Sequence, residues 1–206
     1  AAVETRSVEE QYARDNELFK KQLGYLLQHS EFYKHKLAAA GITDAQQING
    51  LEDITHLPFT EKDEIRATQA ACPPYGAHLA VDPRKLRRVF STSGTTGVPC
   101  YLGLTQLDLD MYATNVARGY TAAGFRPGQS VVVGFNAGPF VAGGVYYGFD
   151  KIGCNVIPVG TGNTERMVTA IQRLGATGVS CTPSYALYLI EWCRDNNIAP
   201  ESLGLK

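Results

Sequence analysis

The segment Ser91–Pro99 is the part of this sequence whose residue types could do chemistry. It reads Ser-Thr-Ser-Gly-Thr-Thr-Gly-Val-Pro, so hydroxyl residues and two glycines follow one another almost without interruption. Glycine lets a backbone turn tightly and approach a ligand closely, while main-chain amides and side-chain hydroxyls supply hydrogen-bond donors. A ring of such donors suits the oxygens of a phosphate group. The segment therefore predicts a phosphate-binding loop.

Two widespread phosphate-binding patterns do not describe this segment. No Gly-Lys-Ser or Gly-Lys-Thr closes it, so it is not a Walker A loop. The Gly-x-Gly-x-x-Gly fingerprint of dinucleotide-binding folds is missing as well. On composition alone, a surface loop rich in Ser, Thr and Gly that binds nothing is an alternative interpretation.

The elements around the loop predict how it is positioned. A short strand, Arg88–Ser91, ends where the loop begins, and Ser130–Phe135 is an apolar run typical of a strand covered on both faces. Strands and helices then alternate, which predicts right-handed crossovers and a parallel sheet. The expected fold class is therefore α/β, with ligands at the carboxyl ends of the strands. The further strands are expected at 155–159 and 178–181, and the helices at 105–123, 139–152, 164–174 and 184–196.

The first 75 residues have a different texture and predict a small helical layer. Ser7-Val8-Glu9-Glu10 reads as a capping box ahead of a helix, and a second helix is expected from a cap at Ser30 to a stop at Gly41. We predict an N-terminal helical region at 1–75 and an α/β core at 76–206. No chemistry is expected from the helical region.

Composition excludes several classes of protein. The 19 Lys and Arg residues against 20 Asp and Glu give a net charge of −1, which offers no basic stripe for nucleic acid. No apolar run approaches the roughly 20 residues of a membrane span, and no signal peptide is recognisable. The five cysteines and four histidines lack metal-ligand spacing. We therefore expect a cytoplasmic protein with no membrane contact, no protein-bound metal and reduced, mostly buried thiols.

In its residue order, Thr92–Pro99 resembles the nucleotide-phosphate loop of the adenylate-forming superfamily of acyl-CoA synthetases, adenylation domains and luciferases. Within that superfamily the chain is most similar to the phenylacetate–CoA ligase branch, over about Ser7–Lys206. Residues 76–206 would then be an incomplete N-terminal domain of such a ligase, with its parallel βαβ sheet. The supporting segments are Leu57–Asp63, Gly153–Pro158, Gly162–Arg166 and Cys181–Leu187.

The resemblance implies a two-step reaction of aromatic-acid catabolism. A small aryl, phenylacetate-like carboxylate attacks the α-phosphate of ATP to give an acyl-adenylate and pyrophosphate, and coenzyme A then takes the acyl group. Mg²⁺ would bridge the phosphates, so ATP, Mg²⁺ and CoA are the expected cofactor set. The residues matched to the phosphate loop are Thr92, Ser93, Gly94, Thr95, Thr96 and Gly97.

Two positions depart from the family pattern. Many superfamily members end this loop with Pro followed by Lys, and the phenylacetate branch usually has Thr there; this chain has Cys100. The Lys usual in that branch before the Pro is Val98 here. A mobile cation over the β- and γ-phosphates is therefore missing, whereas the amide and hydroxyl donors remain.

The acid-binding pocket is expected beyond the strand that ends near Phe135. Aromatic residues there could wall a flat, apolar acid, with Gly143 and Gly144 leaving room for it. Equally, these aromatics could be core contacts of a helix packed on the sheet. The loop Gly160–Thr164 could approach the ligand, although Thr164 as a helix cap is favoured. The candidate substrate-binding residues are Phe140, Tyr146, Pro183 and Tyr185.

Several parts of an adenylate-forming ligase have no counterpart in these 206 residues. The adenine motif, the acidic ribose contact, the hinge and the lid with its catalytic Lys lie further along the family's chains. We therefore expect the N-terminal portion of a longer ligase, inactive without the C-terminal part of the same polypeptide, and a homodimer stays open. Two alternatives remain: a non-catalytic nucleotide- or acyl-binding module, and an adenylating enzyme with an acceptor other than CoA.

Overall fold

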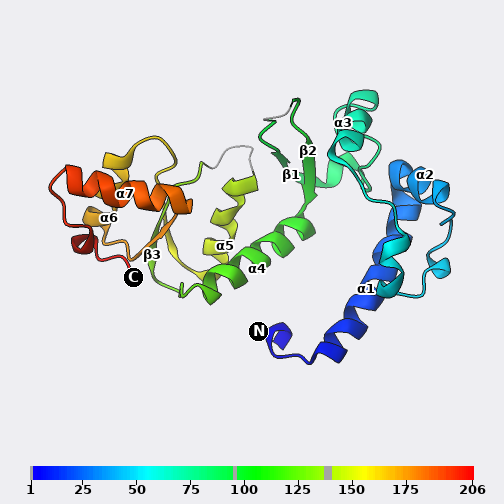
Figure 1. Ribbon diagram of the computed structural model, residues 1–206, viewed down its shortest axis with the longest axis horizontal. Coiled ribbons are helices and arrows are strands. Elements are labelled where there is room, and N and C mark those ends of the chain that lie inside the picture. The colour runs from blue at the N-terminus through cyan, green and yellow to red at the C-terminus, as the bar shows by residue number, and fades with distance from the viewer. Residues whose placement is uncertain (1, 95–96, 137–140) are drawn as a thin grey trace. The chain divides into compact units, whose positions relative to one another are not determined.

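The computed structural model describes residues 2–94, 97–136 and 141–206 (Figure 1). It divides into two compact units. The first contains Ala1–Leu86 with Gly94–Gly103, and the second contains Arg87–Ser93 with Leu104–Lys206. The domain boundary predicted after residue 75 stays a prediction.

The first unit is built from helices that begin at polar caps. The hydroxyl of Ser7 accepts a hydrogen bond from the Glu10 amide at 3.1 Å, and that of Ser30 accepts one from the Tyr33 amide at 3.4 Å. Both residues cap their helices as predicted, but at Ser7 the described structure has the hydroxyl half of the predicted capping box and not the reciprocal bond from Glu10. Glu61 is the N-cap of a third helix, and its side chain forms a capping box with Glu64. The three helices are α1 Val8–His29, α2 Glu31–Ala39 and α3 Lys62–Ala71.

The core of the first unit is small and aliphatic. It gathers Leu23 of α1, Leu37 of α2, and Ile42 and Ile48 from the turns that follow. Ser30, at the junction of α1 and α2, is 1% exposed, and its hydroxyl oxygen lies 3.3 Å and 3.2 Å from the carbonyl oxygens of residues 77 and 78. A buried hydroxyl therefore ties a later segment to the helix junction.

Two strands lie on either side of the predicted phosphate loop and form a two-stranded sheet: β1 Leu86–Ser91 and β2 Tyr101–Thr105. β1 confirms the predicted strand at 88–91, whereas β2 was missed. β2 contains Gly103, which weakens a strand pattern, but a Cβ at this position would lie 2.8 Å from a methyl carbon of Leu86. The close approach of the two strands thus requires Gly103. The same glycine weakened the strand pattern, which is why β2 was not predicted.

A three-stranded parallel sheet with helices on both faces forms the second unit, which confirms the α/β fold class. The strand order is β4-β3-β5, and Val132 of β3 lies opposite Ile157 of β4 and Val179 of β5. The strands are β3 Ser130–Val133, β4 Asn155–Pro158 and β5 Gly178–Ser180, and the helices are α4 Gln106–Ala122, α5 Val145–Ile152, α6 Thr164–Leu174 and α7 Pro183–Asp195.

Successive valines of β3 point to opposite faces of this sheet, as the period of a strand requires. Val132 packs with Met167 of α6 and Leu189 of α7, whereas Val131 and Val133 pack with Phe149 of α5. β3 therefore runs between α6 with α7 on one side and α4 with α5 on the other (Figure 1). This burial explains why β3 is apolar on both faces.

The helix expected at 139–152 is shorter than predicted. It starts at Val145, after a 3₁₀ turn at Val141–Gly144, and the preceding residues 137–140 lie outside those described. Glycine allows α5 to pack tightly on α4, because a Cβ at Gly148 would lie 2.2 Å from Cγ1 of Val116. At Gly144 it would lie 2.2 Å from the Tyr112 ring, so that ring fills the space that the sequence assigned to a ligand.

The predicted cap of α6 is wrong by one residue. Asn163, not Thr164, caps the helix, since its side-chain oxygen accepts a hydrogen bond from the Arg166 amide at 2.7 Å. Both residue types favour this position. Thr164 instead places its hydroxyl 3.0 Å from the hydroxyl of Tyr185 on α7.

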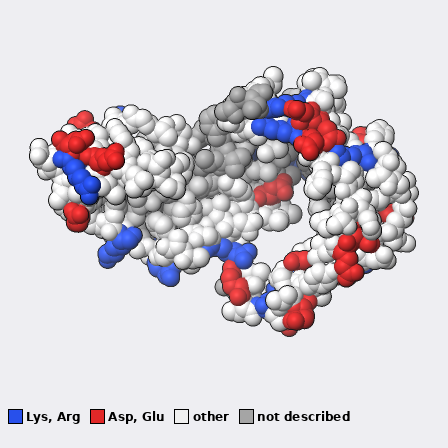
Figure 2. Space-filling model, in the orientation of Figure 1, with Lys and Arg blue, Asp and Glu red and all other residues white. Residues whose placement is uncertain are grey.

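The sequence also made predictions about surface charge, membrane-spanning helices and the cysteines. Acidic and basic side chains are interspersed on the face drawn in Figure 2. Among the described residues, no helix has the length and apolar character to cross a membrane. No disulfide joins the described cysteines. The prediction that most of the thiols are buried is wrong, because Cys100 and Cys193 are buried, Cys154 and Cys181 are half-buried and Cys72 is exposed.

Candidate functional site

The structure describes four of the six predicted phosphate-loop residues. Thr92 is half-buried and Ser93 exposed directly after β1, in the second unit. Gly94 and Gly97 belong to the first unit. Thr95 and Thr96 lie outside the described residues.

Gly94 and Gly97 form a tight turn, and at both positions another residue type would be strained. The Gly97 amide donates to the Gly94 carbonyl at 2.9 Å, and the φ angles of the two glycines are +67° and +143°. A Cβ at Gly94 would lie 2.9 Å from both the Gly97 carbonyl oxygen and Cγ of Pro99. The turn expected from the glycines is present, and phosphate binding by it stays a prediction.

The residues that leave the loop, Val98–Tyr101, are held by α3 in the first unit; we refer to them as the exit segment. The Nε of Arg66 donates to the Val98 carbonyl at 3.0 Å. The side-chain amide of Gln69 donates to the Tyr101 carbonyl at 2.6 Å and accepts from the Tyr101 amide at 3.2 Å. Sequence reasoning missed these residues, because 32 positions separate each from its partner and nothing in their local spacing signals a contact.

The two departures from the family pattern have different environments. Cys100 is 2% exposed and its thiol points toward the Lys62 carbonyl at 3.9 Å, so it belongs to the packing between α3 and the exit segment. Val98 is 71% exposed. Of these two substitutions, one therefore buries a thiol and the other leaves an aliphatic side chain in solvent.

The carboxyl edge of the parallel sheet carries a second cluster of polar groups, within the second unit. Asn136 follows β3, and its side-chain amide donates to the Thr161 hydroxyl at 2.8 Å. The Thr161 amide donates back to the Asn136 side-chain oxygen at 3.0 Å. Gly160 is required beside this pair, because it has a φ of +77° and its Cβ would lie 2.6 Å from the same oxygen. Asn136 thus joins the loops that follow β3 and β4.

Of the two candidate substrate residues near α5, the structure describes Tyr146 but not Phe140. Tyr146 packs on the cluster around Phe149, and its hydroxyl donates to the Phe135 carbonyl at 2.6 Å. Burial raises the pKa of Tyr146 above its usual value. The core contact that the sequence left open is therefore present for this side chain, while substrate binding stays a prediction.

The candidates after β5 lie at the start of α7. Pro183 is the first residue of that helix and is exposed, and the Thr182 hydroxyl accepts from the Tyr185 amide at 3.3 Å to cap it. Tyr185 is half-buried against the α6–α7 core and bonds Thr164 through its hydroxyl. The structure thus brings Tyr185 and Thr164 together at the carboxyl edge.

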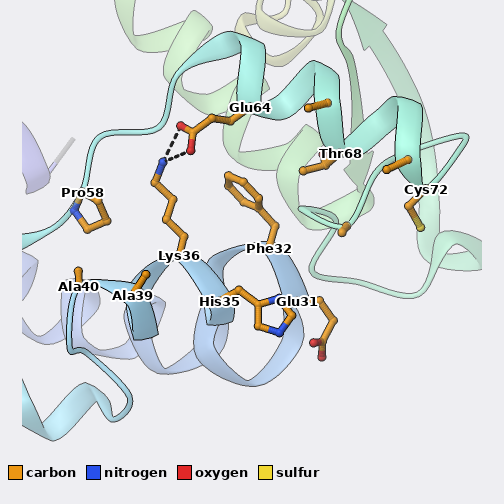
Figure 3. Close-up of a pocket in the computed structure, with 13 residues that line it drawn as sticks. Glu31, Phe32, His35, Lys36, Ala39, Ala40, Pro58, Glu64, Thr68 and Cys72 are labelled. Atoms are coloured by element: carbon orange, nitrogen blue, oxygen red, sulfur yellow. Dashed lines mark hydrogen bonds and ion pairs between the residues drawn. The ribbon is translucent and has the colours of Figure 1, made fainter.

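The first unit also contains an open, largely apolar cavity of about 840 Å³ between α2 and α3. Figure 3 shows Lys36 of α2 reaching Glu64 of α3 across it, with Nζ 2.5 Å from the carboxylate. This hydrogen bond, together with the one from the Glu61 amide, lowers the pKa of Glu64. None of the predicted site residues that the structure describes lines the cavity. Within the described part of the chain, no three His, Cys, Asp or Glu side chains are grouped to hold a metal.

Curated phenylacetate-coenzyme A ligases are similar to this chain in sequence. The phenylacetate-coenzyme A ligase of Thermus thermophilus is 38% identical over 205 residues, which cover 99% of this chain and 45% of the relative. The enzyme of that name from Pseudomonas putida is 34% identical over the same shares. By sequence, the chain is similar to phenylacetate–CoA ligases over almost its whole length. It spans less than half the length of these curated relatives, and no family model matches it.

The fold of the chain is also similar to that of a solved CoA ligase. The 2-hydroxyisobutyryl-CoA ligase in complex with 2-HIB-AMP and CoA, in its thioesterification state, superposes with a TM-score of 0.92 at 29% identity. That match covers 98% of this chain and 43% of the other. The same ligase in its postadenylation state with 2-HIB-AMP gives a TM-score of 0.89, covering 97% and 42%. The predicted resemblance to adenylate-forming ligases is confirmed.

Proposed function

We propose that this chain is the N-terminal part of an AMP-forming acid–CoA ligase that activates an aryl, phenylacetate-like carboxylic acid. The observation that carries the proposal is the 38% identity to a phenylacetate-coenzyme A ligase along 99% of the chain. The likeness to a CoA ligase solved with 2-HIB-AMP and CoA supports the same chemistry. The cytoplasm is the compartment that fits these substrates.

The reaction has two transfers. A carboxylate oxygen of the acid attacks the α-phosphorus of ATP, and pyrophosphate leaves with the electron pair of the broken P–O bond. The thiolate sulfur of CoA then attacks the acyl carbon of the adenylate, and AMP leaves. Such phosphoryl chemistry asks the protein mainly for positioning and for stabilisation of developing charge.

The loop after β1 would supply donors to the nucleotide phosphates. The hydrogen bond from the Gly97 amide to the Gly94 carbonyl supports this role, since it closes the backbone turn expected of such a loop. Mg²⁺ would add charge neutralisation at the phosphates. The proposed phosphate-loop residues are Thr92, Ser93, Gly94, Thr95, Thr96 and Gly97, of which Gly97 uses its amide to close the turn.

The acid would bind at the carboxyl edge of the parallel sheet, where α/β folds place ligands. Pro183 and Tyr185 follow β5 at that edge. Tyr146 has its hydroxyl committed to the Phe135 carbonyl, so its ring is what it could offer an apolar acid. Phe140 completes the proposed set.

Acid-dependent exchange of pyrophosphate into ATP tests the proposal. The full-length parent protein should catalyse this exchange with phenylacetate, and residues 1–206 alone should not, because the catalytic Lys is expected beyond this chain. 2-Hydroxyisobutyrate, the acid of the solved ligase, is the matched control for the preference for an aryl group. A folded parent protein without acid-dependent exchange would contradict the proposal, as would a parent reading frame that stops at Lys206.

A further inference from the structure

We infer that Gln69 and Arg66 of α3 are positioning residues that hold the phosphate loop in shape for ATP through the exit segment. This inference rests on the proposed function and names helix residues that the sequence pattern left without a role. Neither residue is placed in contact with the nucleotide. Their effect is transmitted by the main chain of Val98–Tyr101.

The contact of Gln69 is a two-point clamp on one residue. Its Nε2 donates to the Tyr101 carbonyl at 2.6 Å, and its Oε1 accepts from the Tyr101 amide at 3.2 Å. A primary amide offers a donor and an acceptor side by side, which is the pattern that a neighbouring strand presents to a peptide. Gln69 therefore fixes both the position and the rotation of the backbone at Tyr101.

A second and a third contact act on the same segment from the same face of α3. Arg66 donates to the Val98 carbonyl at 3.0 Å and also pairs with Asp63. The Lys62 carbonyl receives the buried Cys100 thiol. Residues 62, 66 and 69 are spaced by four and three, so they share one helix face. α3 thus contacts three of the four residues of the exit segment.

The exit segment is coupled to the turn of the loop through Pro99. At Gly94 there is room only for hydrogen, because a Cβ would lie 2.9 Å from Cγ of Pro99 and 2.9 Å from the Gly97 carbonyl oxygen. A shift of Pro99 therefore changes the space around Gly94 and the hydrogen bond from the Gly97 amide to it. Holding Val98 and Tyr101 in place therefore holds the hydrogen bond between the Gly97 amide and the Gly94 carbonyl.

A fixed exit segment matters because anion sites gain affinity when their donors are ordered before the ligand arrives. Releasing the clamp should weaken ATP binding. It should leave the binding of the acid and of CoA unchanged, since those substrates are not proposed to use this loop. A purely structural role of α3 would lower stability without separating the substrates in this way.

The test is the Michaelis constant of the full-length protein for each substrate. Gln69→Met keeps the length and helix propensity of the side chain and removes both hydrogen bonds. The matched control is Gln28→Met, at an exposed position of α1. We expect the KM for ATP to rise about tenfold in Gln69→Met, with the KM values for acid and CoA within twofold of the control.

Two further variants keep the test decisive if Gln69→Met folds poorly. Arg66→Ala should raise the KM for ATP, and Arg66→Lys, which retains a donor for the Val98 carbonyl, should restore part of it. A KM for ATP that matches the Gln28→Met control in every variant, or a parallel rise for all substrates, overturns the inference while the proposed function stands. Loss of acid-dependent exchange in the wild-type protein itself overturns both.

Discussion

Gly148→Ala tests the packing of α4 against α5. Both positions of interest lie in helices of the second unit: Gly148 in α5 and, as the matched control, Gly119 in α4. A Cβ at Gly148 would lie 2.2 Å from Cγ1 and 2.7 Å from Cβ of Val116, and 3.1 Å from the Ala117 amide nitrogen. A Cβ at Gly119 would meet nothing within 4 Å.

The magnitudes follow from these distances. Replacing Gly by Ala in a helix interior stabilises by about 1 kcal/mol, which is the full expectation for Gly119→Ala. At Gly148 the same gain is opposed by overpacking, which costs about 1–3 kcal/mol. Val116 is β-branched and stiff in a helix, so it cannot swing away, and the two helices must separate. We expect Gly148→Ala to lose about 1 kcal/mol, some 2 kcal/mol below Gly119→Ala.

Urea unfolding followed by the fluorescence of Trp192 measures this difference. Trp192 is the single tryptophan and packs on the α6–α7 core of the same unit. Val116→Ala removes the 2.2 Å contact but keeps the 2.7 Å one, so the double mutant should recover part of the loss, with a coupling energy of about 1 kcal/mol. Equal stabilisation by Gly148→Ala and Gly119→Ala would refute the packing argument.

Three further outcomes are expected. Thr177→Val should stabilise by about 1 kcal/mol in the same unfolding assay, because the Thr177 hydroxyl is buried with no hydrogen-bond partner in the described structure. Burial lowers the pKa of His78 below 6.5, so its contribution to stability is complete above pH 6.5 and is lost as the pH falls through the folded-state pKa; an NMR titration giving a value above 6.5 would contradict this. On the proposed function, Tyr185→Ala in the full-length parent protein should raise the KM for phenylacetate about tenfold and leave that for ATP unchanged, whereas the more exposed Tyr188→Ala on the same helix should change neither.

Features whose causes lie within a few residues were predictable from the sequence. Ser7 and Ser30 cap their helices because a short hydroxyl side chain satisfies amides two or three positions ahead. The parallel strand at Ser130–Val133 was expected because a run that is apolar on both faces has to be covered on both. The glycine turn after β1 was expected for the same kind of local reason.

Local chemistry was not enough where two neighbours compete for one role. Asn163 and Thr164 are both good caps, and the sequence favoured the threonine. The structure gives the cap to Asn163, while the Thr164 hydroxyl meets Tyr185 from 21 positions away. Likewise, Gly144 suggested room for a ligand, but the Tyr112 ring of another helix occupies that space.

By itself, therefore, the sequence determined the α/β class and the order of its elements apart from β2, and it predicted a loop suited to phosphate, since each depends on side-chain periodicity or on adjacent residues. Tertiary structure decided which residues hold the exit segment and join the strand ends. Gln69 meets Tyr101 across 32 positions, and Asn136 meets Thr161 across 25. Such contacts depend on how distant segments of the chain come together, and no local pattern of residue types records that.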